Sequence, residues 1–157
     1  MRDEQVIPAQ GDGSGDRFPW AEHVTAPRDV EDGHVDVIEI GSMMLRACMN
    51  YLNVGLGLDE DELYNGATHP IVREMKITCS AEVMPGDAMR CDVRVVSRGR
   101  RSFVLEQLLR HAASGREAAA GSVVFVTISR DTGGASEIPR ALWDAVERME
   151  GRRIPSA

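Results

Sequence analysis

One long apolar segment follows Val35, and it is the only segment of this chain suited to cover a sheet. Its apolar residues recur at roughly helical spacing, which predicts a helix with one buried side. These residues are Val37, Ile38, Met44, Leu45, Cys48, Met49 and Leu52. The stretch from Asn53 to Gly57 suits a left-handed C-terminal cap, so we expect the helix to end there.

Four strand-like segments come next, and in the first two the apolar and polar side chains alternate along the chain. They occupy residues 71–83, 88–99, 102–111 and 117–129. The last is apolar on both faces, which favours a central position in a sheet. Residues 17–26 contain Pro19 and form at best a short edge strand, and residues 140–151 form a short terminal helix. We therefore predict an α+β fold, in which a strongly curved antiparallel β-sheet wraps around one long central α-helix.

A chain of 157 residues is enough for one domain and one core. We expect a flexible leader at residues 1–16, a single domain at 17–150 and a flexible tail at 151–157. The chain has no apolar stretch of the signal-peptide type or of membrane-spanning length, which predicts a cytoplasmic protein without a membrane partner. Its net charge of -7 argues against nucleic acid as a partner, because phosphate binding needs a basic face.

The cysteines and histidines do not form a recognisable metal motif. Cys48, Cys79 and Cys91 are far apart and have apolar neighbours, so we expect reduced thiols in the core. The four histidines lack ligand-like spacing with one another or with the cysteines. We therefore predict no metal and no cofactor.

Five carboxylates crowd the entrance to the helix: Asp29, Glu31, Asp32, Asp36 and Glu39. A helix start favours negative charge, because its first N–H groups lack partners inside the helix and lie at the positive end of the dipole. Asp32, or Asp36 if the helix begins later, is well placed as a plain N-terminal cap. The same amides can polarise the carbonyl group of a substrate, so catalysis by a neighbouring carboxylate is the second reading.

Three motifs resemble, in their order and spacing, the hotdog-fold acyl-CoA thioesterases of the 4-hydroxybenzoyl-CoA thioesterase type. The first is GHVD at residues 33–36, followed at the family's spacing by Tyr51 and Leu52. The second is the turn and strand MPGDAMRCDVRVVSRGRRS, and the third is the ending RDTGGASEIPRAL. The resemblance covers about residues 18–146. It implies the hotdog fold and hydrolysis of a thioester, with the acyl group carried by coenzyme A or by an acyl carrier protein.

The family's catalytic aspartate lies three residues before the motif's glycine, where this chain has Val30. The resemblance then implies Glu31 as base or nucleophile, because its longer side chain offsets a shorter loop, and Asp29 as the next candidate. His34 either orients the substrate or makes a structural hydrogen bond, and Glu39 serves as a base only if it faces the pocket. The candidates are Glu31, Asp29, His34 and Asp32 for catalysis, and Gly33, Val35, Asp36 and Glu39 for the oxyanion and substrate positioning.

An arginine turn, defined by Arg98, Arg100 and Arg101, interrupts this otherwise acidic protein. Guanidinium groups match the phosphates of coenzyme A, so the turn is a candidate coenzyme A site, and a solvated hairpin is the alternative. The methionines of the long helix either line an acyl tunnel or, more commonly for a buried helix, fill the core. They are Met43, Met44 and Met49.

Two other functions stay open. Asp29 and His34 have the spacing of the Asp-x-Asn-Pro-x-His motif of MaoC-type enoyl-CoA hydratases, although Glu31 and Asp32 replace its Asn and Pro. A hotdog protein that binds acyl groups without turnover is the other alternative, because the family's aspartate is missing. In each case a single curved sheet leaves a strand edge uncovered, which predicts a homodimer or a dimer of dimers with the pocket between subunits.

Overall fold

The protein's structure, a computed structural model, describes residues 18–57, 59 and 66–157. Five strands form one antiparallel sheet in the order β1-β3-β4-β5-β2. They are β1 (Trp20–Thr25), β2 (Thr68–Cys79), β3 (Ala88–Arg98), β4 (Ser102–His111) and β5 (Glu117–Ser129). The helices are α1 (Val37–Asn50), the π-helix η1 (Tyr51–Gly55) that continues it, and α3 (Arg140–Glu150). The leader expected at residues 1–16 lies outside the described residues.

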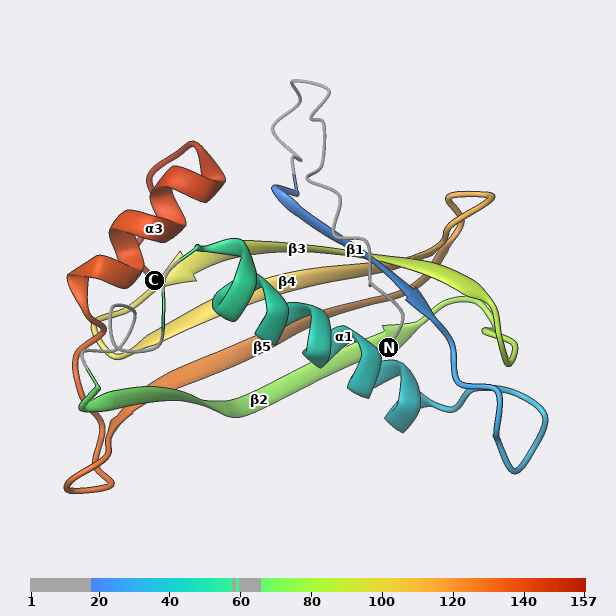
Figure 1. Cartoon of the computed structure of the whole chain (residues 1–157), viewed down its shortest axis with the longest axis horizontal. Helices are drawn as coiled ribbons and strands as arrows, with labels where there is room; N and C mark the ends of the chain where they lie inside the picture. Colours follow the sequence, from blue (N-terminus) through green and yellow to red (C-terminus); the bar gives the residue numbers. More distant parts are fainter. Residues whose placement is uncertain (1–17, 58, 60–65) are drawn as a thin grey trace.

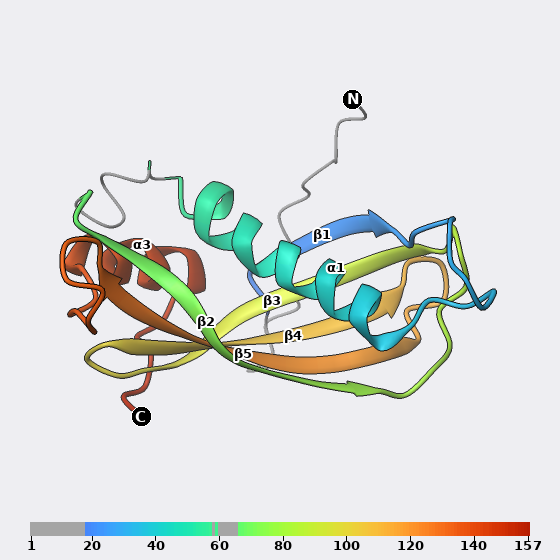
Figure 2. The same ribbon diagram turned by 90° about the horizontal axis from the view of Figure 1, so that it is seen from below.

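Helix α1 lies across one face of the sheet (Figure 1), and the curved strands pass along one side of it (Figure 2). The alternation of the strands explains this packing. In β4, Phe103, Leu105 and Leu109 are buried, whereas Val104 and Leu108, which point to the other face, are only half-buried. The expected α+β fold is confirmed. Within the described residues, no helix is long and apolar enough to cross a membrane.

The positions of the strands follow from their composition. Strand β5, apolar on both faces, lies inside the sheet between β4 and β2, as predicted. The short strand β1 lies at one edge, also as predicted, and β2 forms the other edge. The edge strand β2 runs beside the side of α1 that contains Gly41. We refer to this side of α1 as its open flank.

Two glycines allow α1 to approach the sheet closely. Gly121 of β5 pairs with Ile77 of β2, and a Cβ atom at Gly121 would lie 2.6 Å from the Lys76 carbonyl oxygen and 3.1 Å from the Met44 Cε atom. A Cβ atom at Gly41 of α1 would lie 2.8 Å from the Ile77 Cδ1 atom. Real Cβ atoms do not approach other atoms so closely. At these two positions the helix and the sheet are therefore packed with no room for a side chain larger than hydrogen.

A buried glutamine also ties α1 to the sheet. The side-chain amide of Gln107 donates hydrogen bonds of 2.6 Å to the Met44 carbonyl oxygen and to the Cys48 sulfur. Gln107 is on the inner face of β4, in the row that includes Gly121. Periodicity alone does not reveal such a bond, because the partners are about sixty residues apart in sequence.

Three residues that the sequence places in the core are exposed. The buried side of α1 is centred on Ile40, Met43, Met44 and Ala47, so Val37 and Ile38 in the first turn are 52% and 78% exposed. Cys79 is also exposed, because it ends the edge strand β2, whereas Cys48 and Cys91 are buried as expected. The methionines Met43 and Met44 belong to the core and do not line a tunnel.

Residues 151–157 are not the flexible tail that we expected. Ile154 is buried, and the Arg98 N–H donates to the Pro155 carbonyl oxygen. The Ala157 N–H in turn donates to the Arg98 carbonyl oxygen, so the segment adds a short parallel bridge at the end of β3. Ile154 and these two backbone hydrogen bonds hold the segment, and one apolar residue among polar neighbours is too weak a signal to predict this from sequence.

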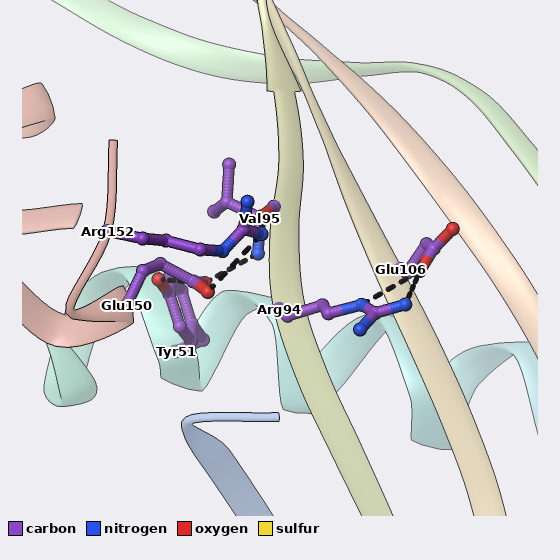
Figure 3. A network of polar contacts seen from close by, with 6 residues as sticks. All are labelled: Tyr51, Arg94, Val95, Glu106, Glu150 and Arg152. Carbon is purple, nitrogen blue, oxygen red and sulfur yellow. Dashed lines mark hydrogen bonds and ion pairs between the residues drawn. The ribbon is translucent and has the colours of Figure 1, made fainter. Parts of the chain in front are cut away.

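A buried carboxylate fastens α3 to the rest of the protein (Figure 3). One Glu150 oxygen accepts hydrogen bonds from the Tyr51 hydroxyl at 3.0 Å and from the Val95 N–H at 2.7 Å. Strand β1 pairs with β3 only as far as Val93, so Glu150 satisfies the Val95 donor beyond the end of β1. Arg152 lies 3.8 Å from the other Glu150 oxygen and donates to the Val95 carbonyl oxygen.

Replacing Glu150 with glutamine is expected to change how stability depends on pH. Burial raises the pKa of the Glu150 carboxyl above its ordinary value, and the Val95 and Tyr51 hydrogen bonds oppose this only in part. The folded protein therefore holds this proton more tightly than the unfolded chain, and stability is lost as pH rises from the unfolded pKa through the folded pKa. Glu150→Gln removes that loss and keeps an oxygen acceptor.

Urea unfolding of Glu150→Gln and of the wild type across this pH range checks the expectation. The difference in unfolding free energy should move in favour of the variant as pH rises, and should then level off. Glu117→Gln is a matched control, because Glu117 is exposed. A difference for Glu150→Gln that does not vary with pH would contradict the expectation.

Candidate active site

The loop between β1 and α1 is fixed at both ends to the connection between β2 and β3. At its start, the Ala26 N–H donates to the Asp87 carbonyl oxygen at 2.9 Å, and the Gly86 N–H donates to the Ala26 carbonyl oxygen at 3.1 Å. At its end, the Val35 N–H donates to the Val83 carbonyl oxygen at 3.0 Å. The loop is therefore held as a defined projection at the start of α1 (Figure 1).

This loop encloses a polar cavity of about 330 Å³. The cavity is lined by Asp29, Val30, Glu31, Asp32, His34, Asp36 and Glu39. The structure thus brings together all four residues predicted for catalysis, and two of those predicted for substrate positioning. Gly33 lies in the same loop with a φ of 75°, a conformation that glycine adopts without a steric cost.

Asp36 is the N-terminal cap of α1. Its side chain accepts hydrogen bonds from the Ile38 N–H at 2.8 Å and the Glu39 N–H at 3.0 Å. The Glu39 carboxylate reaches back to the Asp36 N–H at 3.2 Å and completes a capping box. The structural interpretation of Asp36 is confirmed, and Glu39 is engaged as a cap partner although it lines the cavity. Asp32 is not the cap.

The backbone amides expected to bind an oxyanion are partly occupied. The Val35 N–H donates to Val83, and the Asp36 N–H donates to Glu39, so neither is free for a substrate. This corrects the expected positioning role of these two amides. In the part of the chain that the structure describes, no acceptor contacts the N–H groups of His34 and Val37. These two amides, on either side of the occupied pair, are the available donors at the start of α1.

The remaining acids of the cavity have no partners among the described residues. No hydrogen bond or ion pair there engages the side chains of Asp29, Glu31, Asp32 or His34, and all four are exposed. No group of three or more metal-ligating side chains is placed to hold a metal ion in the described ranges. The arrangement is therefore a cluster of uncommitted carboxylates and one imidazole beside two free amides, which suits proton transfer next to a developing negative charge.

The arginine turn lies away from this cavity. It joins β3 to β4 beside α3, at the opposite end of α1 (Figure 1). Arg98 lies 3.8 Å from Glu147 and packs over the Trp143 ring, while Arg100 pairs with Glu137. The structure of the single chain does not bring the arginines and the acids together. The glutamate partners were not predicted, because they come from a later segment of the chain.

The arginine turn borders a second cavity, of about 410 Å³. Arg98 and Arg100 line it together with Trp143, whereas Arg101 does not. Glu137 lines it as well, and its carboxylate offsets part of the positive charge on the wall. Arg101 is exposed, and no ion pair engages it among the described residues.

Comparison with known proteins identifies the family of this chain. A model of the thioesterase-like superfamily matches residues 26–146, which is more than half of the chain. A comparison with curated proteins finds no significant match.

Solved structures with the same fold include three bacterial proteins. The Synechocystis 1,4-dihydroxy-2-naphthoyl-CoA thioesterase has a TM-score of 0.71 at 15% identity, over 80% of this chain and 93% of its own. A Pseudomonas aeruginosa protein has a TM-score of 0.71 at 25% identity, over 84% and 92%. A Staphylococcus aureus protein solved in complex with CoA has a TM-score of 0.74 at 15% identity, over 98% and 89%. The structures show the shared fold, and the family match covers α1, the acid cavity and the strands β2 to β5. The chain belongs to the thioesterase-like superfamily.

Proposed function

We propose that the protein hydrolyses the thioester of an acyl-CoA, or of an acyl group on an acyl carrier protein. The observation that carries this proposal is the cavity at the start of α1, where the uncommitted Glu31 carboxylate lies with His34 and two free amides. Membership of the thioesterase-like superfamily supports the reaction class. The Staphylococcus aureus neighbour, solved in complex with CoA, supports coenzyme A as a carrier.

In the proposed reaction, Glu31 takes a proton from a water molecule that attacks the carbonyl carbon, or attacks that carbon itself. The carbonyl oxygen becomes negative and accepts hydrogen bonds from the His34 and Val37 amides at the positive end of the α1 dipole. The carbon–sulfur bond then breaks, and the carrier leaves as a thiolate that takes up a proton. When water attacks, it supplies the second oxygen of the acid product directly. When Glu31 attacks, a water molecule then hydrolyses the Glu31–acyl anhydride, which releases the acid and restores the carboxylate. Asp29 is the next candidate for the base.

We also propose that the protein self-associates as a homodimer or a dimer of dimers. The edge of β2 has no partner strand among the described residues, and an apolar stripe runs along the open flank of α1 beside it. The stripe consists of Ile38, which is exposed, and of Leu45 and Met49, which are half-buried. Pairing of two β2 edges about a two-fold axis would cover this stripe, with the substrate pocket between the subunits at its Ile38 end. It would also bring the arginine turn of the partner subunit toward the acid end of the first.

Light scattering checks this assembly. We expect a mass of two or four subunits at micromolar concentration, and a shift toward the monomer for Ile38→Glu, which places a charge on the stripe. Val54→Glu is a matched control, because Val54 is 59% exposed but lies in η1, outside the stripe. A monomeric wild type would contradict the proposal.

A panel of acyl-CoA thioesters tests the proposed reaction. Release of free thiol from at least one member is the expected result, and no release with any acyl group would contradict the proposal. A second function is kept because Asp29 and His34, the pair with MaoC-type spacing, line the same cavity. Hydration of crotonyl-CoA without thiol release would select that hydratase, and binding without either reaction would select a non-catalytic acyl-binding protein.

A further inference from the structure

The acid cavity is too polar to hold an acyl group. Val30 is the one apolar residue among those that line it. An acyl group whose thioester lies at the start of α1 must therefore rest on a neighbouring apolar surface. Val37 and Ile38 provide it, because they follow the cap Asp36 directly and are 52% and 78% exposed.

The space between α1 and the sheet is closed to an acyl chain. Met44 is fully buried, and its Cε atom occupies the space next to Gly121, 3.1 Å from where a Cβ atom would stand. Gln107 fills the adjoining position and is bonded to the Met44 carbonyl oxygen. An acyl chain cannot pass between the helix and the sheet without displacing this packed core.

The surface available to an acyl group along the open flank of α1 is short. Gly41 follows Val37 by four residues and Ile38 by three, so all three lie on one face of the helix. At Gly41 that face meets Ile77 of β2, whose Cδ1 atom lies 2.8 Å from the position of an added Cβ atom. Met75, the next residue inward on β2, also lies against Gly41. Ile77 therefore stands across this face after roughly one helical turn, about 5.4 Å, and separates Val37 and Ile38 from Leu45 further along α1.

We propose that Ile77, seated against Gly41, sets the length of the acyl group, so that the enzyme takes short or single-ring acyl groups and excludes long chains. This inference rests on the proposed thioesterase function. Ile77 acts by filling space, and it does not take part in the chemistry. The absence of a side chain at Gly41 allows Ile77 to reach the helix and to block the way along its flank there.

A chain-length profile tests this role. kcat/KM for thiol release is measured with acetyl-, butyryl-, hexanoyl-, octanoyl-, decanoyl-, palmitoyl- and benzoyl-CoA, for the wild type and for Ile77→Ala. We expect the wild type to prefer the shorter chains or benzoyl-CoA. Ile77→Ala should raise kcat/KM for octanoyl- or decanoyl-CoA by about tenfold or more, the effect typical of methylene groups in an apolar pocket. Butyryl-CoA should change by less than about threefold, well under that range.

Ile71→Ala is the matched control, because Ile71 is in the same strand, is 41% exposed and does not contact Gly41. Its profile should equal that of the wild type. If Ile77→Ala fails to fold, Ile77→Val provides the same test with a smaller shift toward longer chains. Equal cleavage of palmitoyl- and butyryl-CoA by the wild type, or an unchanged profile in both Ile77 variants, would overturn this inference alone. Absence of thiol release from every substrate would overturn the proposed function and this inference with it.

Discussion

Replacing Glu31 with glutamine is expected to lower kcat for thiol release by about 10²- to 10⁴-fold, the range that a positioned general base contributes. The substitution keeps the size of the side chain and removes its capacity to take a proton. Glu31 makes no hydrogen bond or ion pair among the described residues, so its replacement should leave the unfolding free energy unchanged. This variant should therefore lose activity without losing stability.

Glu117→Gln controls for the loss of one negative charge, because Glu117 is exposed at the start of β5, outside the acid cavity. It should retain the activity of the wild type. Full activity in Glu31→Gln would remove Glu31 as base or nucleophile, and the same measurement on Asp29→Asn would then identify the next candidate. If Glu31→Gln lost both activity and folding, this would contradict the expectation that Glu31 does not contribute to the unfolding free energy.

Replacing Gly121 with alanine is expected to destabilise the protein by about 1–3 kcal/mol or more, as overpacking of a filled core does. The new Cβ atom would meet a backbone carbonyl oxygen, that of Lys76, at 2.6 Å, and the backbone of an adjacent strand cannot move without disturbing the sheet. The Met44 Cε atom, at 3.1 Å, must also shift. Urea unfolding measures the effect as a lower midpoint with an unchanged slope.

Gly134→Ala is the matched control for this substitution. A Cβ atom at Gly134 would lie 3.4 Å from the Thr132 hydroxyl oxygen, which is an ordinary contact. Its midpoint should stay close to that of the wild type. A wild-type midpoint in Gly121→Ala would mean that β5 and β2 separate more readily than their contact at Gly121 indicates.

The sequence predicts the elements whose signals are local. The alternation along β2 and β3, the apolar period of α1 and an aspartate cap at the helix start each depend on neighbours within a few residues. The grouping of the acids into one cavity was also predictable, because Asp29 to Glu39 belong to a single loop and the helix turn that follows it. Motif spacing then identified the family.

Contacts between distant segments were not predictable. Glu150 reaches Tyr51 across 99 residues, and nothing in either segment indicates the other as its partner. The same holds for Arg100, which pairs with Glu137, and for the Val35 amide, which the Val83 carbonyl oxygen occupies. These contacts decide which charges and donors are available to a substrate, so the role of each candidate residue required the three-dimensional structure.

The attachment of the Val35 amide to Val83 has one more consequence. Val83 follows the last residue of β2 by four positions. The acidic loop is therefore hydrogen-bonded to the segment that directly continues the edge strand β2. A backbone change at the end of β2 would therefore reach the carboxylate loop through the hydrogen bond between Val35 and Val83. A substitution at Cys79, the last residue of β2, is therefore expected to change activity without contacting the reactive groups.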